Sequence, residues 1–249
     1  MSRVPQPQPD EDPLNPKAAA SALDFLLIEL VPLAQRVTEQ VNARHKALRE
    51  QYERTRTSIR TTASTPINQD EQQGANAENG AIGREAKRSV DDQEPALTSL
   101  GFPVMTEQTR EGVFWRLDGM GYRVGQGLVE RFSVNKPRPT NELDAIKFIC
   151  KDLWILVFRK QIDNLKTNHR GIFVLTDNKF QPLSKMSIDR RAGNKAAEET
   201  AARAQTYLYY PCGVIRGALS GFGMEVTVEG STTEIPSATF QIKTKGAKP

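Results

Sequence analysis

Residues 141–180 read NELDAIKFICKDLWILVFRKQIDNLKTNHRGIFVLTDNKF, and this stretch decides the fold because its hydrophobic period changes partway along. Asn141 has the side chain of a helix N-cap, with Asp144 in the first turn. The apolar residues that follow alternate in steps of three and four, as on one face of a helix: Leu143, Ile146, Cys150, Leu153 and Val157. We predict one helix that runs to about Asn168.

The second part of this stretch has the composition of β-structure. Ile172–Leu175 is a short apolar run, Asp177 and Asn178 offer turn chemistry, and Phe180 begins a return strand. These features predict a hairpin. We expect the preceding Asn168–Gly171 segment to stop the helix, with Gly171 in a backbone conformation that other residues avoid.

Two further helices are predicted upstream. The first spans about Lys17–Val37, where Pro32 would kink it or end its first part; Thr38–Arg60 is compatible with a charged, solvated extension. The second begins near Gly112 and continues to Phe132. Its four glycines would each cost about 1 kcal/mol in an isolated helix, so they need a packing reason: Gly119, Gly121, Gly125 and Gly127.

Downstream of the hairpin the pattern alternates between helix and strand. Ser187–Gln205 is expected to be a surface loop or a solvated helical turn that contributes little to a core. Tyr207–Phe222 has the small-residue composition of a closely packed helix. Glu225–Val228 and Thr239–Lys243 are predicted strands, the latter with Phe240 and Ile242 pointing inward. This order predicts the α/β (α+β) class, a helical layer packed on a small antiparallel sheet.

The composition predicts that part of the chain is disordered. The chain has 249 residues and only 38% hydrophobic content, which is low for a fully compact globule. Thr61–Pro95 contains few large aliphatic residues and cannot offset its ordering entropy. We therefore predict a disordered tail at 1–16, one domain formed by 17–37 and 113–247, and an insertion at 38–112 made of a charged helix extension and a disordered linker.

Charge and hydropathy argue against several classes of protein. There is no run of about 18 apolar residues, and the proline-rich, acidic start is unlike a signal peptide, so we expect a cytoplasmic, non-secreted protein. The net charge is +4, but basic and acidic residues alternate along the chain. Without basic clusters and interleaved aromatics, no nucleic-acid partner is expected.

No catalytic, metal or cofactor site is predicted. The two cysteines, Cys150 and Cys212, and the two histidines are too few and too scattered for a zinc site, and both cysteines have the setting of buried hydrophobes. His169 has no nucleophile nearby in the sequence. The glycines of Gly119–Gly127 follow a helical pattern and lack the spacing of a phosphate-binding loop, so helix packing is the better interpretation.

Three segments carry a family resemblance: GMGYRVGQGLVERF (119–132), residues 141–180, and CGVIRGALSGFGM (212–224). They resemble the small core subunits of the transport protein particle, the TRAPP complex, and in particular the subunit-six branch of the Bet-three-like family. With the first helix, the similarity covers about 18–37 and 113–243. It implies an α/β fold with helices on one side of a four-stranded antiparallel sheet.

The resemblance also implies a function. Such subunits have no active site of their own and build the TRAPP core as side-by-side heterodimers, here with the lipid-modifiable subunit. The complex tethers vesicles and exchanges guanine nucleotide on a Rab/Ypt-type GTPase in endoplasmic-reticulum-to-Golgi and Golgi transport, as a peripheral membrane assembly. The implied partner face, in which the glycines would let helices of two chains approach closely, is Leu23, Leu26, Leu27, Leu30, Val124, Leu128, Arg131 and Phe132.

Two departures and one alternative accompany this interpretation. The Asn135–Asn141 loop has no cysteine, so lipidation is not carried over, and the 38–112 insertion is longer than the family pattern needs. The alternative function is a small-molecule or lipid-binding module of the same fold. That alternative requires a cavity inside Trp154, Phe158 and Leu219. An enzyme is the third and weakest hypothesis.

Overall fold

A computed structural model describes residues 19–63, 97, 104–134, 137–187 and 193–246 of the chain. The predicted tail and about half of the predicted insertion, residues 64–96 and 98–103, lie outside these residues. The elements are α1 (Ala20–Ala63), α2 (Glu107–Phe132), α3 (Glu142–Phe148), the π-helical η1 (Ile149–Leu153), α4 (Trp154–Phe158), β1 (Asn164–Thr167), β2 (Ile172–Asp177), α5 (Gln181–Ser184), α6 (Gly193–Thr206), α7 (Tyr209–Gly221), β3 (Val226–Ser231) and β4 (Ala238–Thr244).

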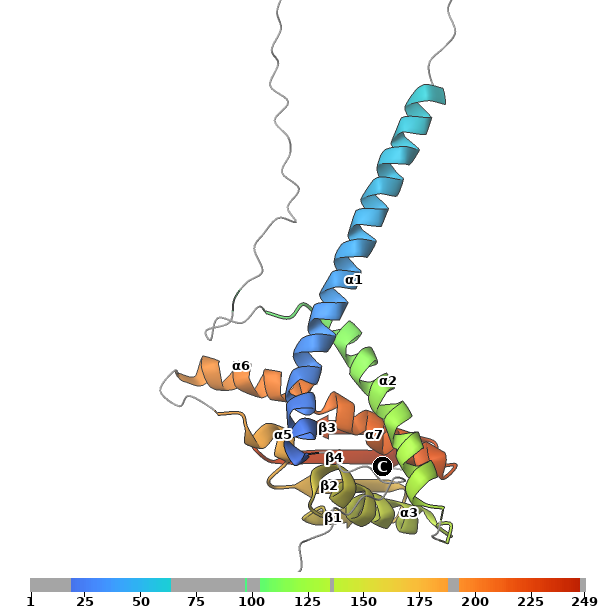
Figure 1. Ribbon diagram of the computed structural model, residues 1–249, viewed down its shortest axis with the longest axis vertical. Coiled ribbons are helices and arrows are strands. Elements are labelled where there is room, and N and C mark those ends of the chain that lie inside the picture. The colour runs from blue at the N-terminus through green and yellow to red at the C-terminus, as the bar shows by residue number, and fades with distance from the viewer. Residues whose placement is uncertain (1–18, 64–96, 98–103, 135–136, 188–192, 247–249) are drawn as a thin grey trace, which may run out of the picture.

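The four strands form one antiparallel sheet in the order β1-β2-β4-β3. Phe173 lies opposite Ile242 and Leu175 opposite Phe240. All four of these side chains are buried, whereas their neighbours along each strand are half-buried, so one face of the sheet is covered by the helices (Figure 1). The expected α+β class, and the inward direction of Phe240 and Ile242, are confirmed.

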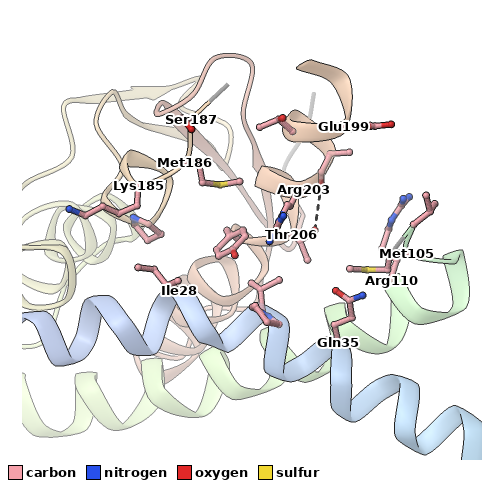
Figure 2. A pocket seen from close by; sticks show the side chains of 17 residues that line it. Ile28, Gln35, Met105, Arg110, Lys185, Met186, Ser187, Glu199, Arg203 and Thr206 are labelled. Carbon is pink, nitrogen blue, oxygen red and sulfur yellow. Dashed lines mark hydrogen bonds between the residues drawn. The ribbon is translucent and has the colours of Figure 1, made fainter. Parts of the chain in front are cut away.

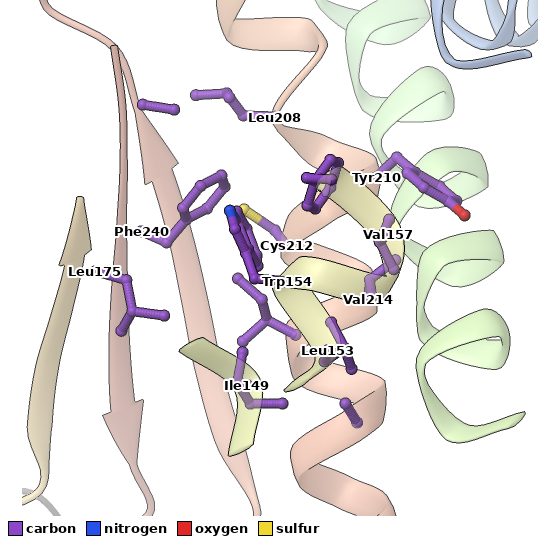
Figure 3. Close-up of a cluster of buried hydrophobic side chains, with 14 of the residues drawn as sticks. Ile149, Leu153, Trp154, Val157, Leu175, Leu208, Tyr210, Cys212, Val214 and Phe240 are labelled. Atoms are coloured by element: carbon purple, nitrogen blue, oxygen red, sulfur yellow. The ribbon is translucent and has the colours of Figure 1, made fainter. Parts of the chain in front are cut away.

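The core between sheet and helices is built around Trp154, which is completely buried (Figure 3). Its ring centre lies 4.5 Å from that of Phe158 and 5.3 Å from that of Phe240. Phe180 adds a further ring, 5.0 Å from Phe158. On the other side, Cys212 and Val214 of α7 close the cluster. These rings and aliphatic groups fill the space between helix and sheet.

The helix that begins after Asn141 is shorter than predicted. Its cap is confirmed, because the Asn141 side chain accepts a hydrogen bond from the Asp144 N–H at 2.8 Å. The helix ends at Phe158, where Arg159 takes a left-handed conformation with φ of 59°. The prediction that it reaches Asn168 is wrong, because Leu165 is in β1 and pairs with Leu175 across the sheet. Cross-strand pairing therefore outweighs the helical spacing there.

The hairpin consists of β1 and β2, not of β2 and a return strand. Asn168 makes its turn, since its side-chain oxygen accepts hydrogen bonds from the N–H groups of Arg170 and Ile172. Gly171 has φ of 91°, in the left-handed region, as expected. The predicted return strand at Phe180 is wrong, because this residue is the buried N-cap of α5 and the sheet position next to β2 is taken by β4.

Two other segments are more ordered than predicted. Residues 193–206 form helix α6, in which Ala196, Thr200 and Ala204 are buried, so the expectation of a segment with little core contribution is wrong. Helix α1 runs for 44 residues without ending at Pro32, about 66 Å at 1.5 Å per residue. The core contacts of Leu30 and Ala34 on either side of the proline offset its cost in the helix.

Glycines allow α2 and α7 to pack in close contact. A Cβ added at Gly121 or Gly125 of α2 would overlap the α7 backbone. The reverse holds for Gly213 and Gly217 of α7, where a Cβ would overlap the α2 backbone. By contrast, a Cβ at Gly127 would meet no atom within 4 Å. The glycine requirement is therefore local to the α2–α7 contact.

We predict that Gly125→Ala destabilises the chain by about 1–3 kcal/mol, because the new methyl group has to push two helix backbones apart. Gly127→Ala is the matched control in the same helix, and it should be neutral or stabilising by up to about 1 kcal/mol. Urea unfolding followed by circular dichroism measures both values. Equal stability changes for the two variants would contradict the close-contact role of Gly125.

Candidate partner interface

Helices α1 and α2, which the family resemblance implies form a partner face, cross at Thr38. Thr38 is 3% exposed, and its methyl group fills the space that a side chain at Gly112 would need. The Arg116 Nε–H donates a hydrogen bond of 3.0 Å to the Thr38 hydroxyl, which in turn bonds to the Ala34 carbonyl at 2.7 Å. The crossing thus includes a part-buried polar contact between the helices, and each helix keeps one side facing away from it.

The four predicted interface residues of α1 do not share one environment. Leu27 and Leu30 are 7% and 6% exposed and belong to the core of the chain itself. Leu23 is half-buried and packs against that core. Leu26 is 55% exposed. As a correction to the face that the family resemblance implies, Leu27 and Leu30 point inward, because the apolar stripe they share packs within this chain, where α1 contacts α2 and α5, and does not face solvent.

On α2 the predicted residues lie mostly at the surface. Val124 and Phe132 are each 39% exposed, and Arg131 is exposed with its guanidinium carbon 5.9 Å from the centre of the Phe132 ring. Leu128 is half-buried and packs against the core. Val124, Arg131 and Phe132 are therefore available to another molecule, and Leu128 only in part.

Sequence reasoning missed four exposed apolar side chains of these helices. Phe25 is 70% and Leu33 is 45% exposed on α1, and Trp115 is 62% and Met120 is 37% exposed on α2. A signal for the first two is present in the sequence: residues 23–34, LDFLLIELVPLA, are apolar on every side of the helix. A helix with that pattern is normally buried on all sides, but the core of this chain covers only one side of it.

The exposed side of α1 combines apolar and charged groups. Leu26 and Leu33 are seven residues apart and so lie on one side of the helix. Glu29 and Arg36, also seven apart, form an ion pair of 2.5 Å on the same side. Exposed ion pairs contribute little stability, whereas gathered large apolar side chains mark interaction surfaces. The outer side of α1 therefore has the chemistry of a protein interface.

Two of the four predicted glycines of α2 do not serve the contact between chains that the family resemblance implied. Gly121 and Gly125 face α7 of the same chain. Gly119 and Gly127 would meet no atom within 4 Å if they carried a Cβ. Interchain close approach is thus wrong for the first pair, because their open side is already filled by α7.

The cysteines have the properties of packing residues. Burial raises the pKa of Cys150 and of Cys212 to about 12, so both thiols stay protonated near neutral pH and are poor nucleophiles. His169 is exposed at the β1–β2 turn. Within the described part of the chain, no three His, Cys, Asp or Glu side chains gather as a metal site would need.

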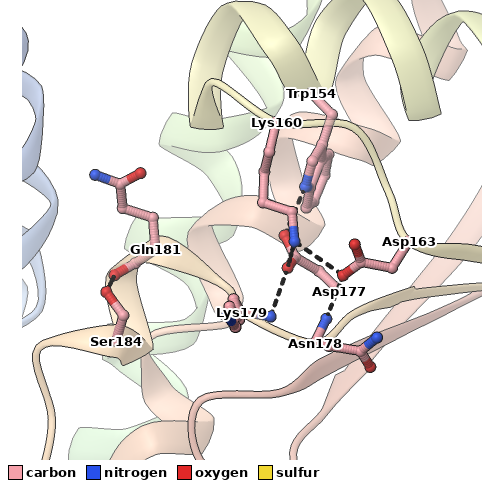
Figure 4. Close-up of polar contacts among 8 residues, drawn as sticks. All are labelled: Trp154, Lys160, Asp163, Asp177, Asn178, Lys179, Gln181 and Ser184. Carbon is pink, nitrogen blue, oxygen red and sulfur yellow. Dashed lines mark hydrogen bonds and ion pairs between the residues drawn. The ribbon is translucent and has the colours of Figure 1, made fainter.

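A buried carboxylate links α4 to the sheet (Figure 4). Asp177 is fully buried and accepts hydrogen bonds from Trp154 Nε1–H at 2.9 Å and from the Lys160 ammonium at 2.6 Å. Lys160 also binds Asp163 at 2.8 Å. Burial lowers the pKa of Lys160, but its hydrogen bonds to the two carboxylates raise that pKa by more. The hydrogen bond from Lys160, assisted by the Asn178 N–H, lowers the pKa of Asp163.

A groove of about 820 Å³ lies between α1, α5 and α6 (Figure 2). Its lining includes Ile28, Pro32 and Met186, together with the charged Arg110 and Lys185. This position differs from that of the cavity required by the ligand-binding alternative. There Trp154, Phe158 and Leu219 are 0–2% exposed, and the rings of Trp154 and Phe158 pack against each other and against Phe180. The interior place proposed for a small molecule is occupied by side chains.

Among the residues that the structure describes, none of the helices has the length and apolar character that crossing a bilayer requires. Helix α1 is long enough, but charged residues follow one another through its second half.

The sequence matches the family described as "Transport protein particle (TRAPP) component" over residues 23–245. Trafficking protein particle complex subunit 6B of Homo sapiens is 48% identical over 127 residues, which are 51% of this chain and 75% of the human protein. Subunit 6A of Bos taurus is 45% identical over 130 residues, 51% of this chain and 74% of the bovine protein.

A solved structure is also similar to this chain. It is trafficking protein particle complex subunit 3 from Naegleria fowleri, covalently bound to palmitic acid, with a TM-score of 0.44 and 16% sequence identity. The similarity covers 56% of this chain and 84% of that one.

We predict that Lys160→Met lowers the free energy of unfolding by about 1.5–3 kcal/mol near neutral pH, because it removes a charged partner from a buried carboxylate. The pKa of Asp163 is lowered by Lys160, so this part of the stabilisation is present above the ordinary value of 3.8 and is lost as pH falls through the lowered pKa. The difference in free energy of unfolding between wild type and Lys160→Met should therefore decrease in acid. Urea titrations at several pH values, with Lys166→Met as control, measure it; a pH-independent difference would contradict the pairing.

We predict opposite outcomes for two neighbouring leucines of α1. Leu27→Asp should unfold the chain or lower its melting temperature by many degrees, since it buries a carboxylate in the core. Leu26→Asp should leave the melting temperature of the isolated chain nearly unchanged, because that side chain is 55% exposed. Thermal unfolding of both variants tests the orientation of α1. Comparable destabilisation by the two substitutions would show that α1 is rotated from its position here.

Proposed function

Since this chain belongs to the TRAPP component family, we propose that it is a core subunit that binds a neighbouring subunit through the outer sides of α1 and α2. Membership is shown by the match over residues 23–245, and the subunit 6A and 6B relatives support the subunit-six branch. The assignment of the interface rests on the large apolar side chains that are exposed on the two helices. They are Phe25, Leu26, Leu33, Trp115, Met120, Val124 and Phe132.

The proposed contact is a four-helix arrangement with the lipid-modifiable subunit of the core. Helices α1 and α2 pack against each other and each presents exposed surface away from that contact, as two helices of such an arrangement require. Leu26 and Val124 lie at the surface and are the residues of the sequence-predicted face best placed for it. Leu27 and Leu30 do not touch the partner in this arrangement; they hold α1 in position by packing in the core of the chain.

We also propose a role for the assembled complex. It would tether vesicles and act as a nucleotide exchange factor for a Rab/Ypt-type GTPase in transport from the endoplasmic reticulum to the Golgi and within the Golgi. The chain would then be cytoplasmic and peripheral at those membranes. What supports this is family membership together with the interface chemistry of α1 and α2.

We assign the chain a non-catalytic, scaffolding role. The named relatives are subunits of a complex, and both cysteines are buried thiols with raised pKa. The division into a domain of 17–37 with 113–247 and an insertion at 38–112 remains a prediction. Helix α1 continues unbroken to Ala63 and α2 begins at Glu107, so the helical ends of that insertion are extensions of domain helices.

The experiment is co-expression of this chain with the lipid-modifiable subunit, followed by size-exclusion chromatography. The double variant Leu26→Asp and Val124→Asp should abolish the heterodimer while the isolated chain keeps its circular dichroism spectrum, because both side chains are exposed in the free chain. Ile155→Asp is the control, since Ile155 is 46% exposed on a different helix and should leave the complex intact. Retention of the heterodimer by the double variant would contradict this interface.

A further inference from the structure

The second half of α1 projects away from the domain (Figure 1). Helix α2 begins at Glu107 and covers α1 as far as the crossing at Thr38. Beyond it, α1 continues to Ala63, and every side chain described from 43 to 59 is exposed. The exposed residues include large apolar ones: Leu48 at 53%, Tyr52 at 68% and Ile59 at 64%. Single exposed apolar residues are common on protein surfaces, but a row of large ones along one helix marks an interaction surface.

These residues follow a heptad pattern in phase with the buried side of α1. Steps of four and three residues connect Val41, His45, Leu48, Tyr52, Thr55 and Ile59, a set that we call the heptad stripe. The same steps lead backward to the buried residues Leu27, Val31, Ala34 and Thr38. The stripe is thus a continuation, beyond the domain, of the side of α1 that packs against α2. Its spacing of 3.5 residues suits a contact with another helix.

Charge is distributed unevenly around this part of α1. The positions that flank the heptad stripe are occupied only by basic or neutral residues: Asn42, Arg44, Arg49, Gln51, Arg56 and Ser58. The two acidic residues, Glu50 and Glu53, lie on the opposite side, where Glu50 is within 4.0 Å of Arg54. Flanking positions of this kind select the charge of a partner helix.

We propose that the heptad stripe is a docking site for an amphipathic helix of another protein, one with acidic residues on either side of its apolar stripe. Arg44, Arg49 and Arg56 would pair with those acids while Leu48 and Tyr52 meet the apolar side chains. The site lies past the crossing of α1 with α2 and is separate from the outer sides assigned above to the neighbouring subunit.

A second copy of this chain and a membrane fit the surface less well. Two copies would bring the flanking arginines of one stripe against those of the other, and such like-charge contacts are unfavourable. A helix bound at a membrane surface carries a broad apolar face. Here the apolar residues form one narrow row, with His45 and Thr55 within it.

The test uses the full chain and a labelled synthetic peptide with Ile and Leu at the heptad core positions and Glu at the flanking positions. Fluorescence anisotropy should show salt-sensitive binding. The Arg49→Glu and Arg56→Glu double variant should weaken it by about tenfold or more. The Lys46→Glu and Arg54→Glu variant makes the same charge change away from the stripe and should bind like wild type. A peptide of the same design with Lys at the flanking positions should bind the Arg49→Glu and Arg56→Glu variant more tightly than it binds wild type.

The Leu48→Asp and Tyr52→Asp double variant should lose peptide binding while its melting temperature stays unchanged, because both residues are outside the core. Three results would overturn the proposal. One is the absence of binding to the acidic peptide. Another is dimerisation of the chain through the stripe in sedimentation experiments, lost in the Leu48 and Tyr52 variant. The last is binding to vesicles of phosphatidylcholine and phosphatidylserine that depends on the same two residues and exceeds peptide binding.

Discussion

Helices α2 and α7 approach each other over four glycines, and the rest of the domain is arranged around that contact. Gly121 and Gly125 meet the backbone of α7, and Gly213 and Gly217 meet the backbone of α2. Polar groups at the edges of the contact hold its register: Asp118 pairs with Arg216, and the Tyr122 hydroxyl lies 2.8 Å from that of Ser220. Because close backbone packing tolerates no added methyl group, it leaves little freedom in the position of either helix.

This contact determines which surfaces remain for other molecules. Helix α7 is buried along most of its length, since α2 covers one side and the core beneath the sheet covers the other. Helix α2 is held on its glycine side and against α1 at Thr38, so Trp115, Met120 and Val124 are left at the surface. The proposed partner interface is therefore the side of α2 that its packing within the chain does not use.

Helix α1 performs different tasks along its length. Around Leu27, Val31 and Ala34 one side completes the core, while Phe25 and Leu33 face solvent on other sides. Past Thr38 the same stripe has left the domain, and its apolar residues Leu48, Tyr52 and Ile59 are exposed. The helix continues through Pro32 because core contacts on both sides of the proline compensate for the missing hydrogen bond.

The sequence by itself determined the features that depend on neighbouring residues. The Asn141 cap, the helix at 209–221, the inward Phe240 and Ile242 and the α+β class all follow from local periodicity and side-chain chemistry, and the family resemblance followed from contiguous segments. Only the tertiary structure decided that Leu165 is in a strand, that Phe180 caps a helix, and that Ala204 is buried.

In the candidate site, too, some features follow from the sequence and others only from the tertiary structure. The spacing of apolar residues correctly indicated that α1 has a buried stripe, yet it could not say that Leu27 faces the core of the chain while Leu26 faces solvent. Nor could it say that Gly121 and Gly125 pack against α7 instead of a second chain. The physical reason is that periodicity reports which residues share a side of a helix, whereas the identity of what covers that side depends on contacts between segments far apart in the sequence.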